Sequence, residues 1–209
     1  MPDDQRDILN LSMREFLSAT AAKTPTPGGG SVAGVAGALA TALGEMALNF
    51  TRGKKKFAKH AEFHEHLAGR LLKAREMFQQ LVADDMAAYR LYQETQRLED
   101  GPSKEQAVAT ATAAAVNVPR EMTKLALAIL DDLHSLADRC NPWLITDLAA
   151  GGALAVAVLR LCDYNVRINA ANMSDRAVAE ELRASSRADL EKGIQTFNTI
   201  EQVVGKHLP

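Results

Sequence analysis

The chain has 209 residues, 47% of them hydrophobic, which is enough for one domain, residues 1–209, with a sizeable core. Its formal net charge is −2 with no sustained basic stripe, which argues against a nucleic-acid partner. The first ten residues are charged, unlike a signal peptide. The apolar part of residues 24–44 and the run 148–159 are both shorter than the roughly 18 residues that would suggest a membrane span. We therefore expect a cytoplasmic protein with no membrane partner.

Helical periodicity dominates the chain. Alanine is abundant, aromatic residues make up only 5%, and no segment alternates apolar and polar residues over the length of a strand, so we predict an all-α, multihelical fold. A first helix is predicted over residues 5–21, and it stops before Pro25 because the residue preceding a proline avoids the helical region. Its predicted buried side consists of Ile8, Met13, Phe16 and Leu17.

A second helix is predicted from the glycines near residue 30 to Asn49. Small residues gather on one flank of it: Gly30, Gly34, Ala38 and Thr41, with Gly37 and Gly44 alongside. Glycine inside a helix costs about 1 kcal/mol relative to alanine, and the close approach of a neighbouring helix is the natural compensation. We therefore expect this helix to be central and tightly packed.

A long third helix is predicted over residues 57–98, with one carboxylate on its apolar stripe. The stripe consists of Phe63, Leu67, Leu71, Ala74, Phe78, Leu81, Ala88 and Tyr92. Between Leu81 and Ala88 the stripe lacks one apolar residue, and the position where that residue is expected is occupied by Asp85. An unpaired carboxylate there costs several kcal/mol or has a raised pKa, so Asp85 is a candidate functional residue; alternatively, the stripe drifts and Asp85 lies at its edge.

The second half of the chain contains three more helical segments. Ser103 and Gln106 form a capping-box pattern after the turn at 101–102, and Pro119 either kinks this fourth helix or begins a new one that ends near residue 139. The segment "CNPWLITD" is predicted to be a connection between helices. Helices are then predicted over residues 146–171 and, for about thirty residues, after Ser174.

The helix predicted over residues 146–171 carries three further candidates. Asp147 lies near its start, where a carboxylate is also simply favourable for the helix dipole. Asn165 and Asn169 are four residues apart, on one face, among apolar neighbours. Buried amides need hydrogen-bond partners, which either a polar ligand or the neighbouring helices would supply.

Two motifs flank the second helix. In "TPTPGGGSVAG", residues 24–34, the amides of Gly28 to Gly30 would form an anion site at a helix N-terminus, with Gly29 allowing a positive φ or the close approach of a ligand. The alternative is a sharp connection that binds nothing. In "NFTRGKKKF", Lys54, Lys55 and Lys56 form either a solvated surface or a clamp for a ligand rich in carboxylates.

No metal site or nucleophilic triad is predicted. His60 and His64 have metal-ligand spacing, but "HAEFH" places its glutamate one position too late for the H-E-x-x-H motif, so we interpret both as surface residues. Cys140 and Cys162 are not in a CxxC pattern and are interpreted as reduced thiols.

The motifs together resemble a known family. "PTPGGGSVAG", "GKKKF", "ADDMAAY", "ITDLAAGGALAV" and "NVRIN", in this order, resemble the formimidoyltetrahydrofolate cyclodeaminase and methenyltetrahydrofolate cyclohydrolase family over nearly the whole chain. The resemblance implies an all-helical homodimer acting on one-carbon derivatives of tetrahydrofolate, with no tightly bound cofactor. It most resembles the free-standing cyclohydrolases, and the cyclodeaminase is the alternative.

The resemblance also implies roles for the candidate residues. Asp85, Asp147 and Lys55 are the catalytic candidates, for proton transfer and for placing charge near a cationic substrate. The substrate-binding candidates are Pro27, Gly28, Gly29, Gly30, Ser31, Lys54, Lys56, Asn165 and Asn169. Two departures from the family pattern are Thr146, where serine is common before the aspartate, and Phe57, where tyrosine is commoner.

Two other classes of protein are compatible with the same motifs. One is a non-catalytic helical dimer without an active-site cleft, in which Asp85 would be paired internally. The other is an anion-binding enzyme unrelated to folate, which a folate-binding measurement would distinguish. The residues do not separate hydrolysis from deamination, because both reactions share the same cation and a tetrahedral centre.

Overall fold

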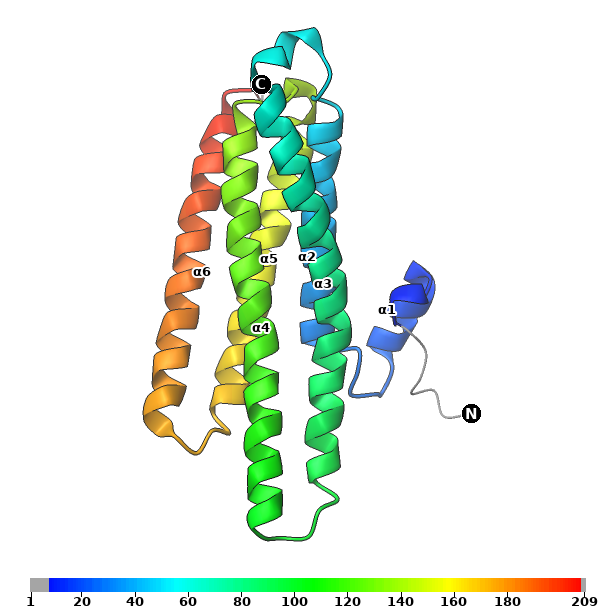
Figure 1. Cartoon of the computed structure of the whole chain (residues 1–209), viewed down its shortest axis with the longest axis vertical. Helices are drawn as coiled ribbons and strands as arrows, with labels where there is room; N and C mark the ends of the chain where they lie inside the picture. The colour runs from blue at the N-terminus through cyan, green and yellow to red at the C-terminus, as the bar shows by residue number, and fades with distance from the viewer. Residues whose placement is uncertain (1–7, 208–209) are drawn as a thin grey trace.

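The computed structural model describes residues 8–207 and contains only helices and their connections in that range (Figure 1). The all-α prediction is therefore confirmed. In chain order the elements are η2 (Ile8–Asn10), α1 (Met13–Ala21), α2 (Gly29–Asn49), η3 (Lys55–His60), α3 (Ala61–Thr95), α4 (Pro102–Ala137), η4 (Pro142–Leu144), α5 (Ile145–Ala170) and α6 (Arg176–Gly205), where η denotes a 3₁₀ helix.

Helices α2 to α6 form an elongated bundle, and α1 lies to one side of it (Figure 1). Helices α2 and α5 pack against each other, and α3, α4 and α6 cover the side that faces the viewer. The centre is filled by fully buried side chains such as Phe78, Met122, Leu133 and Leu159. Each contributes about 1.5–3 kcal/mol to stability through burial, and together they hold the helices against one another.

Helix α2 is the tightly packed central helix that its small residues predict. A Cβ atom on Gly37 would collide with the ring of Phe78, and one on Gly34 would collide with the side chain of Val82. On α5, a Cβ atom on Gly151 would lie 2.9 Å from the carbonyl oxygen of Ala40. The glycines therefore let α3 and α5 approach the backbone of α2 more closely than larger residues would allow.

Helix α4 is continuous through Pro119, so the alternative in which a new helix begins at this residue is wrong. The predicted cap at Ser103 is also wrong: Gly101 is the N-cap and Pro102 occupies the first turn, where its missing N–H has no helical partner to lose. Inside the helix, however, Pro119 leaves the carbonyl of Ala115, four residues earlier, without its usual donor.

Helix α1 is shorter than predicted and mostly uncovered. It begins at Met13 because Ser12 and Glu15 form a capping box, with the Ser12 N–H donating to the Glu15 carboxylate at 2.8 Å. Of its predicted buried side, Ile8 is buried in η2 but Met13 and Leu17 are each 59% exposed. Residues 5–7 of the prediction lie outside the described residues.

Helix α3 begins at Ala61 rather than near residue 57, because η3 precedes it. The interpretation of His64 as a surface residue is wrong: it is buried, and its Nε2 atom lies 3.0 Å from the carbonyl oxygen of Arg139. The first turn of α3 packs against the end of α4 there, which covers the ring. Among residues 8–207, no group of three or more His, Cys, Asp or Glu side chains is placed to hold a metal ion.

Helix α2 and the segment 142–170 are each long and apolar enough, by length and composition, to cross a membrane. The prediction that both apolar runs fall short of that length is therefore wrong, since the structure extends each run along its helix. About half of each apolar window is buried inside the bundle. The exposed large apolar side chains of the two helices are Leu39 and Met46 on α2 and Tyr164 and Ile168 on α5.

Candidate active site

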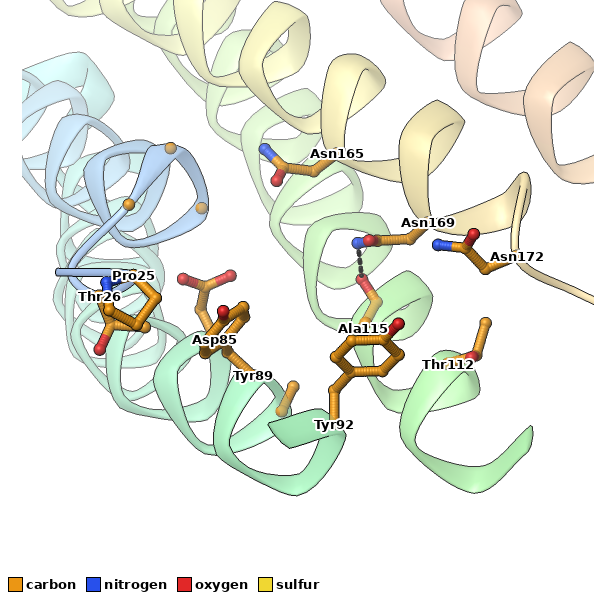
Figure 2. Close-up of a pocket in the computed structure, with 14 residues that line it drawn as sticks. Pro25, Thr26, Asp85, Tyr89, Tyr92, Thr112, Ala115, Asn165, Asn169 and Asn172 are labelled. Atoms are coloured by element: carbon orange, nitrogen blue, oxygen red, sulfur yellow. Dashed lines mark hydrogen bonds between the residues drawn. The ribbon is translucent and has the colours of Figure 1, made fainter. Parts of the chain in front are cut away.

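A cavity of about 250 Å³ lies at the end of the bundle where α2 begins and α5 ends. Figure 2 shows side chains of α3 on one side of it and asparagines of α5 on the other. The fourteen residues that line it are Pro25, Thr26, Gly28, Gly29, Gly30, Asp85, Ala88, Tyr89, Tyr92, Thr112, Ala115, Asn165, Asn169 and Asn172. The lining therefore comes from α2, α3, α4, α5 and their connections, and none of the described residues in it is basic.

Among the described residues, Asp85 is the only acidic one in this lining. It is half-buried, and the hydroxyl of Ser31, on the first turn of α2, donates a hydrogen bond of 2.8 Å to its Oδ2 atom. Burial raises the pKa of Asp85 above its ordinary value, and the hydrogen bonding from Ser31 offsets part of that rise. A carboxylate with a raised pKa in a cavity has the properties of a proton-transfer group.

The glycine turn makes room for this carboxylate. A Cβ atom on Gly30 would collide with the carboxylate group of Asp85, so the absence of a side chain is what lets Asp85 reach Ser31. The expectation of a positive φ in this turn is wrong: among the described residues only Gly53 and Gly101 have one. Gly28 is the N-cap of α2, and because it has no side chain it forms no capping hydrogen bond. The first backbone amides of α2 therefore border the cavity without a capping side chain.

Two of the asparagines are held by backbone carbonyls. Asn165 donates from Nδ2 to Leu161 on its own helix at 2.8 Å, and Asn169 donates to the carbonyl of Ala115 on α4, also at 2.8 Å (Figure 2). Ala115 is the residue whose helical donor Pro119 removes, so this carbonyl is free to fix Asn169. The alternative in which helices supply the partners of these amides is therefore confirmed, and binding of a ligand by the two asparagines, which line the cavity, stays a prediction.

Thr112 lines the cavity with a buried hydroxyl. Its Oγ1 atom has no hydrogen-bond partner within the described structure. A buried hydroxyl without a partner costs about 1–3 kcal/mol, and a polar ligand in the cavity would supply the missing bond. Sequence reasoning missed Thr112, Tyr89 and Asn172, because none of them interrupts a hydrophobic pattern.

The remaining predicted site residues lie elsewhere in the chain. Ser31 and the buried Pro27 belong to the glycine turn beside the cavity, whereas Lys54, Lys55 and Lys56 follow the far end of α2. Asp147 lies in the first turn of α5, at the same far end (Figure 1). Because α2 has 21 residues, the lysines are about 30 Å from the cavity of their own chain. One chain does not bring them together with Asp85.

The two cysteines are not nucleophiles. Both are buried, and burial raises the pKa of Cys140 to about 11 and that of Cys162 to about 12. At neutral pH each is a protonated thiol, which neither attacks an electrophile nor binds a metal readily. Asp85 thus remains the described group in this region with the properties of a catalytic acid or base.

Fold and cavity define an all-helical protein with a half-buried carboxylate at one end of its bundle. A family model described as formiminotransferase-cyclodeaminase matches residues 12–188. The chain belongs to this family.

Several relatives share most of the chain. It is 30% identical to the methenyltetrahydrofolate cyclohydrolase of Methylorubrum extorquens over 177 residues, which are 82% of this chain and 85% of that protein. It is 28% identical to the formimidoyltransferase-cyclodeaminase of Mus musculus over 87% of this chain but only 35% of that protein. The crystal structure of formiminotetrahydrofolate cyclodeaminase from Thermotoga maritima superposes with a TM-score of 0.82 at 30% identity, covering 96% of this chain and 97% of that one.

Proposed function

We propose that the protein is a methenyltetrahydrofolate cyclohydrolase, which converts 5,10-methenyltetrahydrofolate and water to 10-formyltetrahydrofolate. The observation that carries the proposal is Asp85, a carboxylate with a raised pKa in a cavity without basic residues. Such a site suits a cationic substrate, because the carboxylate stabilises positive charge and the amides of Asn165 and Asn169 offer polar contacts to a heterocycle. The cyclohydrolase of Methylorubrum extorquens, similar over most of both chains, supports the assignment.

The proposed reaction uses water as its only co-substrate. The Asp85 carboxylate removes a proton from water as the water oxygen bonds to the methenyl carbon of the amidinium. This gives a neutral tetrahedral intermediate. The bond from that carbon to N5 then breaks, N5 receives the proton from Asp85, and the intermediate hydroxyl loses its own proton as the formyl group forms on N10. One proton is released overall, which balances the positive charge of the substrate.

Deamination of 5-formiminotetrahydrofolate to the methenyl compound is the second candidate. The similarity to the Thermotoga maritima cyclodeaminase over nearly the whole chain favours it. In that reaction N10 attacks the formimino carbon and the N10 proton passes to the formimino nitrogen. Asp85 would supply the second proton, with which that nitrogen departs as ammonia when its bond to carbon breaks. The same carboxylate serves both reactions, so the reactions must be separated by assay.

Absorbance of 5,10-methenyltetrahydrofolate tests the assignment directly. With the purified protein we expect its absorbance to fall faster than by spontaneous hydrolysis, and 5-formiminotetrahydrofolate to remain unchanged. Formation of the methenyl chromophore from 5-formiminotetrahydrofolate would favour the deaminase instead. No acceleration of either reaction would contradict a folate enzyme.

Thr112→Val is expected to weaken substrate binding without harming the fold. Valine keeps the shape of threonine but removes the unpaired hydroxyl, so the free energy of unfolding should rise, by up to the roughly 1–3 kcal/mol that such a hydroxyl costs. KM should increase by about 5- to 10-fold, the value of one hydrogen bond, with kcat little changed. Thr123→Val is the matched control: its hydroxyl already donates to the Pro119 carbonyl at 2.9 Å and does not line the cavity. An unchanged KM in Thr112→Val would show that the hydroxyl does not contact substrate.

We also propose that the protein is a homodimer. The uncovered apolar faces of α2 and α5 support this, because large exposed apolar surfaces on a folded chain mark interaction sites. Two-fold dimers are the commonest closed assembly. Sedimentation of the purified chain as a dimer at micromolar concentration is expected, and a monomer alone would contradict it.

A further inference from the structure

Pro119 lowers the stability of the helix that contains it. It is buried in the interior of α4, which continues for 36 residues without a break. A proline at such a position removes one backbone hydrogen bond and makes the helix less stable than alanine would. Residues that break a local rule in this way occur mainly at functional sites, so Pro119 points to a role outside its own helix.

The carbonyl of Ala115 connects Pro119 to the cavity. Because Pro119 has no N–H, this carbonyl lacks the backbone donor that it would have in a regular helix. The Nδ2 atom of Asn169 donates to it at 2.8 Å, across the contact between α4 and α5. Ala115 and Asn169 both line the cavity (Figure 2), whereas Pro119 is not among the described residues that do so. Pro119 therefore acts on the cavity through the hydrogen bonding of Asn169.

The hydrogen bond to Ala115 fixes which way round the Asn169 amide lies. A carbonyl oxygen only accepts hydrogen bonds, so the amide atom that faces Ala115 must be the nitrogen. The side chain points from α5 toward the side of the cavity that carries Asp85 (Figure 2). Without the bond, rotation about χ2 would exchange the positions of the amide oxygen and nitrogen. With it, the Oδ1 acceptor stays in one place, which suits a ligand group that donates a hydrogen bond.

Asn165 provides a comparison within the same cavity, because no proline is involved in its hydrogen bond. Its Nδ2 atom donates at 2.8 Å to the carbonyl of Leu161, four residues earlier on α5. In a regular helix this carbonyl also accepts the backbone N–H of Asn165, and its two lone pairs accommodate both donors. A change at Pro119 should therefore affect Asn169 and leave Asn165 as it is.

We propose that Pro119 is a positioning residue for substrate binding: it frees the Ala115 carbonyl, and that carbonyl holds the Asn169 amide so that its oxygen accepts a hydrogen bond from an N–H group of the substrate. The inference rests on the proposed function for the identity of the substrate, whose reduced pterin carries such N–H groups. The coupling between Pro119 and Asn169 is independent of that assignment.

Pro119→Ala tests the role, because alanine restores a backbone N–H that competes for the Ala115 carbonyl. With 5,10-methenyltetrahydrofolate, KM should rise by about 3- to 10-fold, the value of one hydrogen bond, and kcat should change little. The melting temperature should stay the same or rise, because alanine is the better helix former. A lower melting temperature together with a lower kcat would indicate general damage to the fold and would contradict a positioning role.

Double variants show whether Pro119 acts through Asn169. Asn169→Ala alone should raise KM by about 5- to 10-fold, and adding Pro119→Ala should raise it no further, because no amide is left to position. In the pair Pro119→Ala and Asn165→Ala, the two effects on KM should instead multiply. Multiplication in both pairs, or an unchanged KM in Pro119→Ala, would overturn the proposal.

Thermal unfolding tests the coupling without any substrate. In the wild-type background, Asn169→Ala leaves the Ala115 carbonyl without a donor and should lower the melting temperature by about 2–4 °C. In the Pro119→Ala background the backbone N–H of residue 119 bonds to that carbonyl, so the same substitution should lower it by less than half as much. Equal losses in the two backgrounds would overturn the proposal. Equal losses without folate turnover would contradict the proposed function as well, whereas unequal losses without turnover would contradict that function alone.

Pro102→Ala is the matched control. Pro102 lies in the first turn of α4, where a proline leaves no helical carbonyl without its donor. KM should therefore stay at the wild-type value in Pro102→Ala, and Asn169→Ala should cause its full loss of melting temperature in this background.

Discussion

Asp85→Asn is expected to lower turnover by about 10²- to 10⁴-fold, because asparagine keeps the shape and the contact with Ser31 but cannot transfer a proton. Stability should stay the same or rise, since burial raises the pKa of Asp85 and the ionised carboxylate therefore lowers the stability of the fold at neutral pH. Turnover and melting temperature measured on one preparation check both expectations. Normal turnover would exclude Asp85 as the catalytic group.

The pH dependence gives an independent check on Asp85. The pKa of Asp85 in the folded protein is raised above the ordinary value of 3.8, so its carboxylate becomes protonated at a higher pH than that of a free aspartate. The acid limb of kcat/KM should therefore lie above pH 3.8, and the destabilising effect of the ionised group should disappear as the pH falls through the same region. Asp84→Asn is the matched control: Asp84 accepts a hydrogen bond from Gln80 at 3.0 Å, does not line the cavity, and should not move either profile.

Gly30→Ala is expected to have the second-largest effect. The added Cβ atom would collide with the Asp85 carboxylate, which must then rotate away from Ser31, and turnover should fall by about 100-fold, as for other displaced catalytic groups. Overpacking should also destabilise the fold by about 1–3 kcal/mol, although alanine is the better helix former.

The control for Gly30→Ala is Gly69→Ala on α3. No atom lies within 4 Å of a Cβ atom there, so the substitution should stabilise the helix by up to about 1 kcal/mol and leave turnover unchanged. Activity assays and thermal unfolding of both variants give the comparison. Wild-type turnover in Gly30→Ala would mean that the carboxylate does not need its contact with Ser31.

The features that the sequence predicts correctly are those that depend on residues close together in the chain. Helical periodicity locates α2, α5 and α6 to within a few residues, and the break it shows at Asp85 marks the carboxylate that lines the cavity. The small flank of α2 predicts the close approach of α3 and α4, because a glycine inside a helix has a cost in free energy that close packing offsets. The family resemblance is confirmed by the match to residues 12–188.

What the sequence does not reveal depends on contacts between helices. The buried His64 contacts the carbonyl oxygen of Arg139, 75 residues further along the chain. The hydroxyl of Thr112 lines a cavity whose other walls are on three other helices. Whether a proline ends a helix or remains inside one also depends on its neighbours. At Pro119, α5 supplies Asn169 as a donor to the carbonyl that the proline leaves free.

Pro119 also offers a rule for protein engineering. In an unbroken helix each interior carbonyl already accepts one backbone N–H, whereas the carbonyl four residues before a proline has no backbone donor and is more available to a facing side chain. A buried proline leaves one carbonyl without a backbone donor at a chosen position along the helix axis, and an asparagine on the facing helix can donate to that carbonyl, as Asn169 does to Ala115. Consider an antiparallel helix pair in which both the proline and the asparagine are moved by seven residues toward the same end of the bundle. The amide held by the free carbonyl then moves by about 10 Å along the bundle. The pair thus forms a portable module for placing an amide inside designed helical bundles.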